Sequence, residues 1–336
     1  MMRIVIATGL YPPEVGGPAY YAEGLAAAFK KAGCGVGVVR YGILKKLPSG
    51  IRHLFYALKL FPAAFFADAV IALDTFSVAL PAALVCSVTR TPLIIRTGGD
   101  FLWEAYAERT HHLIPFQRFY QGHRPFTLKE RAIFRLTKFI LRRGTLVFST
   151  AMQRDVWQIP YKLDASRTEI IGNAVPEPLE SETPREKNYL WHVRPTAIKN
   201  GEHVRAAFAK AKEKHPDITL EEGILPKAEL LSRMRSCYAV ILPSVTEISP
   251  NYILDALRFR KPFIMDKYSG LASWLAPYGI LVDPLDEGDI GRAIEGLANE
   301  EGYKQAQQKV AAFSFVRTYD DVAKDFLGLI ERRRLS

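Results

Sequence analysis

Residues 240–262 read VILPSVTEISPNYILDALRFRKP and join a short apolar run to a polar loop and a helical pattern. The run Tyr238–Leu242 predicts a strand buried in a parallel sheet. The pattern then breaks at Pro243. We expect a helix to restart with Ser249 as its N-cap and Pro250 at its first position, where a missing N–H has no cost.

Two carboxylates lie on either side of this expected helix start. Glu247 falls in the strand-to-helix loop, and Asp255 falls in the second turn of the helix. A helix N-terminus attracts phosphate through its free N–H groups and its dipole, and each carboxylate can accept hydrogen bonds from a sugar. The pattern therefore suits a ligand with hydroxyls on both sides of a phosphate group. A capped helix with two solvated acids is the alternative that the residues leave open.

The order of these residues resembles the signature of retaining glycosyltransferases of the family 4 type. That signature has an acid, seven residues and a second acid, after Pro-Ser and before a Lys-Pro strand, as found here at Glu247 and Asp255. The resemblance implies an α/β chain with the GT-B fold, in which two Rossmann-like domains with parallel sheets face a cleft. It also implies that Glu247 contacts the donor sugar and Asp255 the ribose. Ser249, Asn251 and Tyr252 are then expected to bind the donor at the helix start.

One departure from the family pattern concerns the loop after Glu247. The family usually has glycines there and Glu at the second acidic position, whereas this chain has Ile248-Ser249-Pro250 and Asp255. The resemblance therefore implies a donor sugar that is approached differently in detail.

The length and composition of the chain indicate a globular protein with two domains. Its 336 residues suit two domains of about 150 residues each. The hydrophobic content of 49% and the charged content of 24% are ordinary for such a protein. Three scattered cysteines without metal spacing, Cys34, Cys86 and Cys237, favour a reducing cytoplasm. We expect no signal peptide, since Met1 leads almost directly into a strand, and no apolar run is long enough to span a bilayer.

The net charge of +10 is unevenly distributed along the chain. Residues 1–175 hold 22 Lys/Arg and 11 Asp/Glu, whereas residues 176–336 hold 23 and 24. All of the excess positive charge therefore lies in the first half. A basic domain of this kind favours an anionic partner, either a membrane surface or a polyanion.

Strands and helices are expected to alternate in the first half, which favours a doubly wound parallel sheet. Between the strand Arg3–Thr8 and the helix Pro18–Ala32 lies a loop with Gly16 and Gly17. The loop lacks the GxGxxG fingerprint, so we expect no nicotinamide or flavin cofactor. It resembles the Gly-Gly loop of family 4 transferases, which implies that the backbone at Gly16 and Gly17 approaches the donor phosphate or the acceptor. A tight turn is the alternative.

Asp100 follows a predicted strand in the segment RTGGDFLWE. Ligands of doubly wound sheets bind at the carboxyl ends of strands, so we expect Asp100 to face the cleft. The family resemblance places this loop near the acceptor, which makes Asp100 the acceptor-side candidate among the catalytic residues. An N-cap for the following helix is its alternative role.

A basic segment follows between Arg118 and Arg143, where eight Lys/Arg accompany the single acid Glu130. Its cations recur at helical spacing on one face, which is typical of helices that bind an anionic membrane surface. An ordinary helix with a solvated basic face is the alternative. The cations concerned are Arg131, Arg135, Lys138 and Arg142. A second candidate surface combines Phe55, Tyr56, Phe61, Phe65 and Phe66 with Arg52 and Lys59.

The second domain begins with YLWHVRPTAIKNGEHVRAAF. Arg194 and Lys199 lie in its first strand-to-helix loop and resemble the diphosphate-binding Arg and Lys of the family, although Val193 replaces the usual glycine. The segment HPDITLEEGILPKAELL then passes almost directly to the next strand, so a strand and a helix of the family pattern are missing. We expect a shortened second domain, in which the loops that hold the nucleotide base are absent or rebuilt.

These observations predict four segments. Residues 1–175 form the acceptor-side domain, 176–188 the linker, 189–314 the nucleotide-sugar domain, and 315–336 a terminal helix that returns to the first domain. The predicted function is a metal-independent glycosyltransferase of the cytoplasm, acting at the inner face of the membrane. It needs no cofactor and transfers a sugar from a nucleoside diphosphate to a hydroxyl of a glycan or lipid-linked acceptor in envelope polysaccharide synthesis. A sugar-nucleotide epimerase or phosphorylase on the same fold, or a silent sugar-nucleotide or polyanion-binding protein, is the alternative. No nucleic-acid module or metal-ligand set is recognisable.

Overall fold

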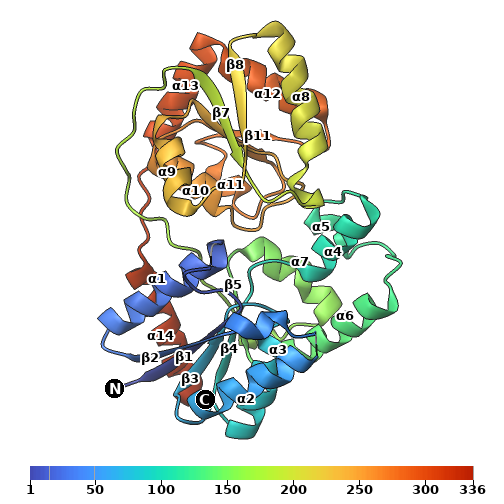
Figure 1. Cartoon of the computed structure of the whole chain (residues 1–336), viewed down its shortest axis with the longest axis vertical. Helices are drawn as coiled ribbons and strands as arrows, with labels where there is room; N and C mark the ends of the chain where they lie inside the picture. The colour runs from blue at the N-terminus through green and yellow to red at the C-terminus, as the bar shows by residue number, and fades with distance from the viewer. Residues whose placement is uncertain (15, 49, 336) are drawn as a thin grey trace. The chain divides into compact units, whose positions relative to one another are not determined.

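The computed structural model describes residues 1–14, 16–48 and 50–335, and it divides the chain into two compact units (Figure 1). Unit 1 comprises Met1–Leu102, Arg124–Ala174 and Arg317–Ser336. Unit 2 comprises Trp103–His123 and Val175–Val316. The terminal segment therefore groups with the first half of the chain.

The segment 103–123 differs from the sequence-based division, which placed it in the first domain. Its residues pack within unit 2 instead. The ring of Trp103 lies 5.4 Å from that of Phe116 between centroids. The backbone N–H of Phe116 donates to Thr246 Oγ1 at 3.0 Å. The hydrogen bond joins residues 130 positions apart along the chain, and no local pattern predicts it.

Unit 1 contains a sheet of six parallel strands in the order β2-β1-β3-β4-β5-β6. Its central strands are apolar and buried on both faces, which is the pattern that a parallel sheet between two helical layers requires. β1 and β2 pair in register from Arg3 opposite Gly35 to Thr8 opposite Arg40. The strands are β1 (Arg3–Thr8), β2 (Gly35–Arg40), β3 (Ala69–Ala72), β4 (Leu93–Arg96), β5 (Thr145–Phe148) and β6 (Thr168–Ile170).

Helices cover both faces of this sheet. α1 and α14 pack together on one face, where the rings of Phe29 and Phe326 meet at 6.3 Å between centroids. α2 and α3 pack together on the opposite face. The helices grouped with unit 1 are α1 (Gly17–Lys31), η1 (Gly42–Lys46), α2 (Ile51–Phe65), α3 (Ala79–Thr89), α6 (Leu128–Leu141), α7 (Ala151–Tyr161), η2 (Ala165–Arg167) and α14 (Tyr319–Leu335).

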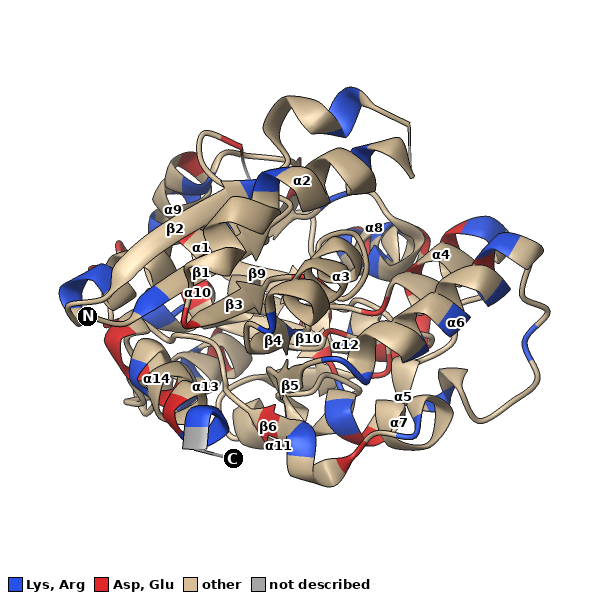
Figure 2. Cartoon of the chain, turned by 90° about the horizontal axis from the view of Figure 1, so that it is seen from below, with Lys and Arg blue, Asp and Glu red and all other residues tan. Residues whose placement is uncertain are grey.

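The excess positive charge of the chain belongs to unit 1. Its three segments hold 25 Lys/Arg and 13 Asp/Glu, a net charge of +12. Basic positions colour the ribbon of α6 blue (Figure 2). Arg131, Arg135 and Arg142 on this segment are exposed. Ile133 and Ile140 are buried on the other side of that helix, as its amphipathic pattern predicts.

Unit 2 contains a sheet of five parallel strands in the order β11-β10-β9-β7-β8. The chain passes from β8 through a single helix, α9, to β9, so the sheet is short in the part where the sequence lacks a strand. The strands are β7 (Lys187–His192), β8 (Ile218–Gly223), β9 (Ala239–Leu242), β10 (Phe263–Asp266) and β11 (Ile280–Val282).

Two helical layers also enclose the sheet of unit 2. α8 and α12 pack on one face through residues such as Val204 and Ile290. α9, α10, α11 and α13 pack on the other through residues such as Met234 and Ile253. The helices are α5 (Phe116–Phe119), η3 (Ala197–Lys199), α8 (Gly201–Lys214), α9 (Lys227–Ser236), α10 (Asn251–Arg258), α11 (Ala272–Leu275), α12 (Glu287–Ala298) and α13 (Glu300–Ala311). α4 (Phe101–Thr110) begins at the end of a unit 1 segment, and its residues from Trp103 belong to unit 2.

The predicted linker runs as an extended strap along unit 2. The backbone N–H of Leu179 donates to the carbonyl of Arg258 at 2.7 Å, and that of Glu182 donates to Arg235 at 2.8 Å. The strap ends where β7 begins at Lys187.

The fold-class prediction of two Rossmann-like domains with parallel sheets is confirmed. In both units the strand that comes first in sequence lies between the second and the third. This order creates a topological switch point, where loops leave two neighbouring strands in opposite directions.

Candidate active site

The switch point of unit 2 lies between β7 and β9. The loop after β7 carries Lys199, and the loop after β9 carries Glu247. Their side chains form an ion pair between Lys199 Nζ and Glu247 Oε1, and both are largely buried. Ser244 Oγ donates a second hydrogen bond to the same carboxylate oxygen at 2.6 Å. The structure thus brings together two of the predicted catalytic residues at the edge of the sheet where ligands of such folds bind.

Asp266, at the end of β10, contacts the backbone of Glu247. Its carboxylate is 0% exposed, and its Oδ2 accepts a hydrogen bond from the backbone N–H of Glu247 at 3.3 Å. Burial raises the pKa of Asp266 well above its ordinary value, and the nearby Glu247 carboxylate raises it further. The backbone N–H of Glu247 and the Lys199 ammonium oppose these effects on the pKa. A raised pKa beside two charged groups is typical of functional sites.

Arg194 lies in the same loop as Lys199, but its side chain is exposed. Its backbone carbonyl accepts from the N–H of Thr196 at 2.8 Å, which tightens the loop. Among the residues that the structure describes, none holds its guanidinium by an ion pair. Arg194 can therefore move toward an anion without breaking an existing contact.

The start of α10 corrects the predicted helix cap. The helix begins at Asn251 with Pro250 at the N-cap, so Ser249 is not the N-cap and Pro250 is not the first helical residue. Pro250 has an extended backbone with ψ near 91°, and its carbonyl accepts from the N–H groups of Ile253 and Leu254. The helix axis therefore starts one residue later than the Ser-Pro pattern suggests.

Tyr252 and Asp255 hold α10 in place. The Tyr252 hydroxyl accepts from the backbone N–H of His192 at 3.1 Å, which ties α10 to the end of β7. The Asp255 carboxylate is buried and forms ion pairs with Lys227 of α9 and with Arg258 at 3.3 Å. These contacts give both residues a structural role, and their role in donor binding stays a prediction.

The unit 1 candidates occupy different positions. Gly16 is the N-cap of α1 and has φ of 149°, in the region where residues with a Cβ are strained, so a glycine is needed there. Gly17 is the first residue of the helix. Asp100 is only 1% exposed, and its Oδ2 accepts from the Trp157 indole at 2.7 Å. Asp100 is therefore buried against Trp157 and directly precedes α4. Its acceptor-side role stays a prediction.

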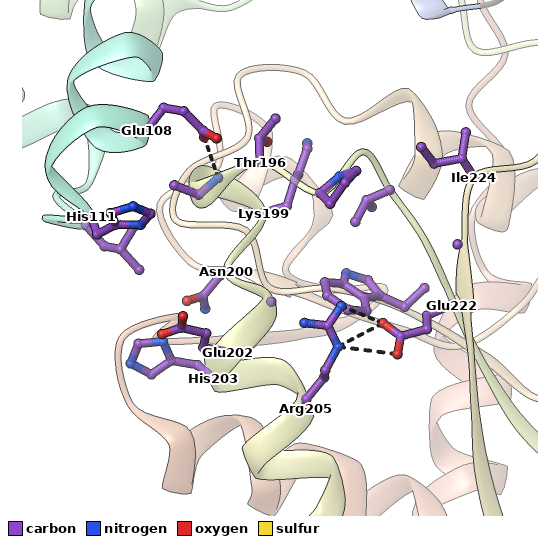
Figure 3. Close-up of a pocket in the computed structure, with 17 residues that line it drawn as sticks. Glu108, His111, Thr196, Lys199, Asn200, Glu202, His203, Arg205, Glu222 and Ile224 are labelled. Atoms are coloured by element: carbon purple, nitrogen blue, oxygen red, sulfur yellow. Dashed lines mark hydrogen bonds and ion pairs between the residues drawn. The ribbon is translucent and has the colours of Figure 1, made fainter.

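A cavity of about 520 Å³ adjoins Lys199 within unit 2 (Figure 3). It lies at the carboxyl ends of β7 and β8, beside the first turns of α8. Trp191 lies at one side with the Arg205 guanidinium 5.2 Å from its ring centroid, and Arg205 pairs with Glu222 at 2.8 Å. On another side Glu108 accepts from the backbone N–H of Ala197 at 2.9 Å.

Three buried polar atoms of cavity-lining residues have no hydrogen-bond partner among the described residues. They are Nε1 of Trp191, Oδ1 of Asn200 and Nδ1 of His203. Burying such a group without a partner costs about 1–3 kcal/mol. The lining of the cavity therefore contains an aromatic ring and three polar atoms that no described residue satisfies.

Lys199 is the cavity residue that the sequence predicted as part of the site, whereas Trp191, Asn200 and Glu108 were not predicted, for two reasons. Trp191 and Asn200 lie in the quoted stretch YLWHVRPTAIKNGEHVRAAF, but a Trp in a strand is more often a core residue. Glu108 comes from a segment far away in the sequence, so no spacing could connect it to β7. The sequence feature that came closest to predicting the cavity was the strand and helix missing from the family pattern, because their absence predicts absent or rebuilt loops in the second domain.

No protein-family model matches the chain, and no curated protein matches it. Solved structures do resemble it. A sucrose-phosphate synthase from Thermosynechococcus elongatus matches with a TM-score of 0.69 and 14% identity, over 100% of this chain and 99% of that chain. WaaG, a glycosyltransferase involved in lipopolysaccharide biosynthesis, matches with a TM-score of 0.65 and 12% identity, over 97% and 100%. The chain has the GT-B fold. The match extends over both units.

A third GT-B structure is an α-glucosyltransferase solved in complex with UDP and a DNA 13-mer. It matches with a TM-score of 0.58 and 11% identity, over 98% of this chain and 99% of that chain. At such identities the likeness establishes the fold, while the activity has to be argued from the site. Within residues 1–14, 16–48 and 50–335, no group of three or more His, Cys, Asp or Glu side chains is arranged to hold a metal. The predicted metal independence stays a prediction.

Proposed function

We propose that this GT-B chain is a retaining glycosyltransferase, similar to those of family 4, that uses a nucleoside diphosphate sugar as donor. The observation that carries the proposal is the Lys199–Glu247 pair at the switch point of unit 2, next to a cavity lined by an aromatic ring and by residues with three buried polar atoms that no described residue satisfies. The reacting part of such a donor consists of a diphosphate and a sugar. The diphosphate is stabilised by a cation such as Lys199, and the sugar hydroxyls donate hydrogen bonds to a carboxylate such as Glu247.

In this proposal Lys199 and Glu247 are paired in the free protein, and each takes a new partner when the donor binds. The diphosphate attracts Lys199 away from Glu247, and the released carboxylate accepts from sugar hydroxyls. Arg194 adds a second cation from the same loop. During transfer the bond from the anomeric carbon to the diphosphate oxygen breaks, and a bond to the acceptor oxygen forms. The leaving diphosphate gains negative charge, which Lys199 and Arg194 stabilise.

The nucleoside half of the donor is proposed to enter the cavity beside Trp191. Lys199 both lines this cavity and touches Glu247, so a diphosphate at Lys199 has the sugar on one side and the nucleoside on the other. The α-glucosyltransferase of similar fold was solved with UDP, which supports a nucleotide ligand for the fold. Asp255 does not line the cavity, and its carboxylate already has two cationic partners.

Thermal unfolding with UDP-, GDP- and ADP-sugars tests donor binding directly. A ligand that binds only the native state at about 100 times its Kd raises the free energy of unfolding by about 2.7 kcal/mol. We expect one nucleotide class to do so. If none stabilises the protein and a polyanion does, the chain is a polyanion-binding protein rather than a transferase.

Two variants test where the nucleoside lies. Ala197→Phe fills part of the cavity and should abolish stabilisation by the free nucleoside diphosphate. Asp255→Asn should leave that stabilisation in place after correction for the lower stability of the variant itself. The reverse result would place the nucleoside at Asp255, as the family resemblance implies.

The acceptor is proposed to be a hydroxyl of a glycan or of a lipid-linked glycan in envelope polysaccharide synthesis, reached from the cytoplasm at the membrane face. The net charge of +12 on unit 1 supports an anionic membrane surface as a partner. No helix in the described part of the chain is long and apolar enough to cross a bilayer. The proposed reaction needs neither a metal nor a cofactor. Adding EDTA to a turnover assay tests the first of these points.

A further inference from the structure

α2 carries large apolar side chains on two opposite sides. Tyr56, Leu60 and Ala64 are 0% exposed and pack into unit 1. With about 100° of rotation per residue, these three positions form one face of the helix. A helix that is apolar only on this face would need polar residues on the other side.

The other side of α2 is apolar as well. Leu54, Leu58 and Phe65 are each 60–61% exposed and lie opposite the buried face. Exposed large apolar residues continue the stripe along α2 and on the adjoining η1 and α3. These residues are Ile43, Ile51, Phe55, Phe61, Phe66, Leu84 and Val88. A group of exposed large apolar residues on helices that pack together is typical of an interaction site.

The charges around this surface have one sign. Residues 42–67 contain Lys45, Lys46, Arg52 and Lys59 and no Asp or Glu. The ribbon of α2 is accordingly coloured blue at its basic positions (Figure 2). α3 contains no charged residue, and Arg90 follows it. On α2 itself, Arg52 and Lys59 fall along one border of the exposed stripe, between it and the buried face.

The nearest acids are already engaged. Glu14 forms an ion pair with Lys45, and Asp68 pairs with Arg334 at 3.0 Å. Asp74 accepts from the backbone N–H groups of Phe76 and Val78 at 2.8 and 2.9 Å. Against these three acids stand six cations, so the net charge of the group is +3. The cations are Lys45, Lys46, Arg52, Lys59, Arg90 and Arg334.

We propose that the exposed face of η1, α2 and α3 docks onto an anionic lipid bilayer, with the apolar stripe of α2 in the headgroup and acyl boundary. In a bilayer surface anionic headgroups lie above the acyl chains. An apolar stripe can therefore enter the acyl region while the cations at its border contact the headgroups. A second copy of the chain fits less well, because it would bring two basic surfaces together. The inference rests on the membrane contact of the proposed function, for which it names the surface, and it does not depend on donor binding.

Vesicle co-sedimentation of the full chain tests the docking. We expect the protein to bind vesicles of equimolar phosphatidylethanolamine and phosphatidylglycerol. The triple variant Leu54→Gln, Leu58→Gln, Phe65→Gln should partition about 100-fold less, because three large apolar side chains no longer enter the bilayer. Since all three side chains are exposed, its thermal unfolding should match the wild type. A variant that keeps its fold and binds as the wild type does would overturn the proposal.

Two matched charge variants distinguish α2 from the basic face of α6. Lys46→Gln with Lys59→Gln should weaken binding to the anionic vesicles by about 10- to 30-fold. Arg131→Gln with Arg135→Gln removes the same charge from α6 and should have a smaller effect. A larger loss from the α6 pair would move the contact to α6 and overturn the assignment to α2.

A fluorescence reporter tests contact at α2 itself. Phe65→Trp should show a blue shift and quenching by brominated lipid on vesicle addition. Ile159→Trp is the control, since Ile159 is also exposed but lies on α7. Equal responses at both positions would contradict an oriented contact through α2. Concentration-dependent dimerisation that the triple Gln variant abolishes, without vesicle binding by the wild type, would assign the face to a second copy of the chain instead. Failure of any of these tests leaves the donor-binding proposal unaffected.

Discussion

Glu247 has its carboxylate held by protein groups, Lys199 and Ser244, rather than by solvent. A carboxylate held in this way is oriented before a sugar arrives, and this lowers the cost of binding the transition state. In the proposed mechanism Lys199 has two roles, since it pairs with Glu247 before the donor binds and with the diphosphate afterwards.

Replacing Glu247 by Gln should therefore lower turnover about 30- to 1,000-fold, which corresponds to about 2–4 kcal/mol of lost transition-state stabilisation. Steady-state kinetics with the donor identified by thermal shift would measure it. Glu295→Gln is a suitable control because Glu295 pairs with Lys214 on the surface of α12 and α8, outside the site. Wild-type turnover in Glu247→Gln would remove the residue from the reaction.

Arg194 and Lys199 should affect the rate more than the affinity, because the leaving diphosphate gains charge as the bond breaks. Arg194→Ala and Lys199→Ala are expected to lower kcat by a larger factor than they raise the donor Kd. Arg194→Ala should leave thermal stability unchanged because the side chain is exposed. Lys199→Ala should lower stability as well, since it leaves the largely buried Glu247 without its cation. Unchanged kcat in both variants would exclude the pair from the site.

Asp266 predicts a pH effect on stability. Its folded-state pKa is raised, so between the ordinary pKa of an Asp and the raised value the native state binds more protons than the unfolded state. The contribution of Asp266 to stability is therefore present at low pH and is lost as pH rises through this window, with a slope of up to about 1.4 kcal/mol per pH unit. Denaturant unfolding of wild type and Asp266→Asn as a function of pH measures the difference. A difference that does not change with pH would contradict the raised pKa.

At the scale of elements, α1 and α14 pack closely where Gly24 faces Tyr319. A Cβ on Gly24 would lie 2.6 Å from the Tyr319 ring, closer than any real contact. Gly24→Ala should therefore destabilise unit 1 by about 1–3 kcal/mol through overpacking. Gly328→Ala in α14 is the matched control, because its Cβ would meet only Arg332 Nη1 at an ordinary 3.6 Å. The control should be neutral or slightly stabilising, since Ala favours a helix over Gly. Chemical denaturation measures the free energy of unfolding of both variants and the wild type. A Gly24→Ala variant as stable as the wild type would contradict the close packing of α1 against Tyr319.

Elements were the most predictable part of the molecule. The strand Arg3–Thr8 matches the sequence-based bounds residue for residue, because a buried parallel strand is a short apolar run between clear breaks. The predicted start of α10 was wrong by one residue. In a Ser-Pro pair the Ser can be the N-cap with the Pro as first helical residue, or the Ser can lie in the loop with the Pro as N-cap, and the structure shows the second arrangement. In the site, Lys199 and Glu247 came from the family resemblance and the structure brings them together. The burial of Asp100 against Trp157 could not be predicted, because it depends on packing between distant segments.

At the scale of the whole molecule, the chain divides its chemistry between two units. Unit 2 carries the Lys199–Glu247 pair and the cavity, whereas unit 1 carries the net charge of +12 and the exposed apolar stripe of α2. This division is consistent with one unit for the donor and one for a lipid-linked acceptor. Affinity for a donor and affinity for a bilayer should therefore respond to separate sets of substitutions.

The most direct test of the central claim is the release of nucleoside diphosphate from the stabilising donor, with and without a lipid-linked or glycan acceptor. The account predicts release that requires the acceptor, a glycoside product with the anomeric configuration of the donor, and loss of both in Glu247→Gln. Equal release without an acceptor, conversion of the donor into its epimer, or an inverted product would contradict retaining transfer. A donor that binds tightly and is never consumed, whatever acceptor is supplied, would show that the site binds sugar nucleotides without catalysing transfer.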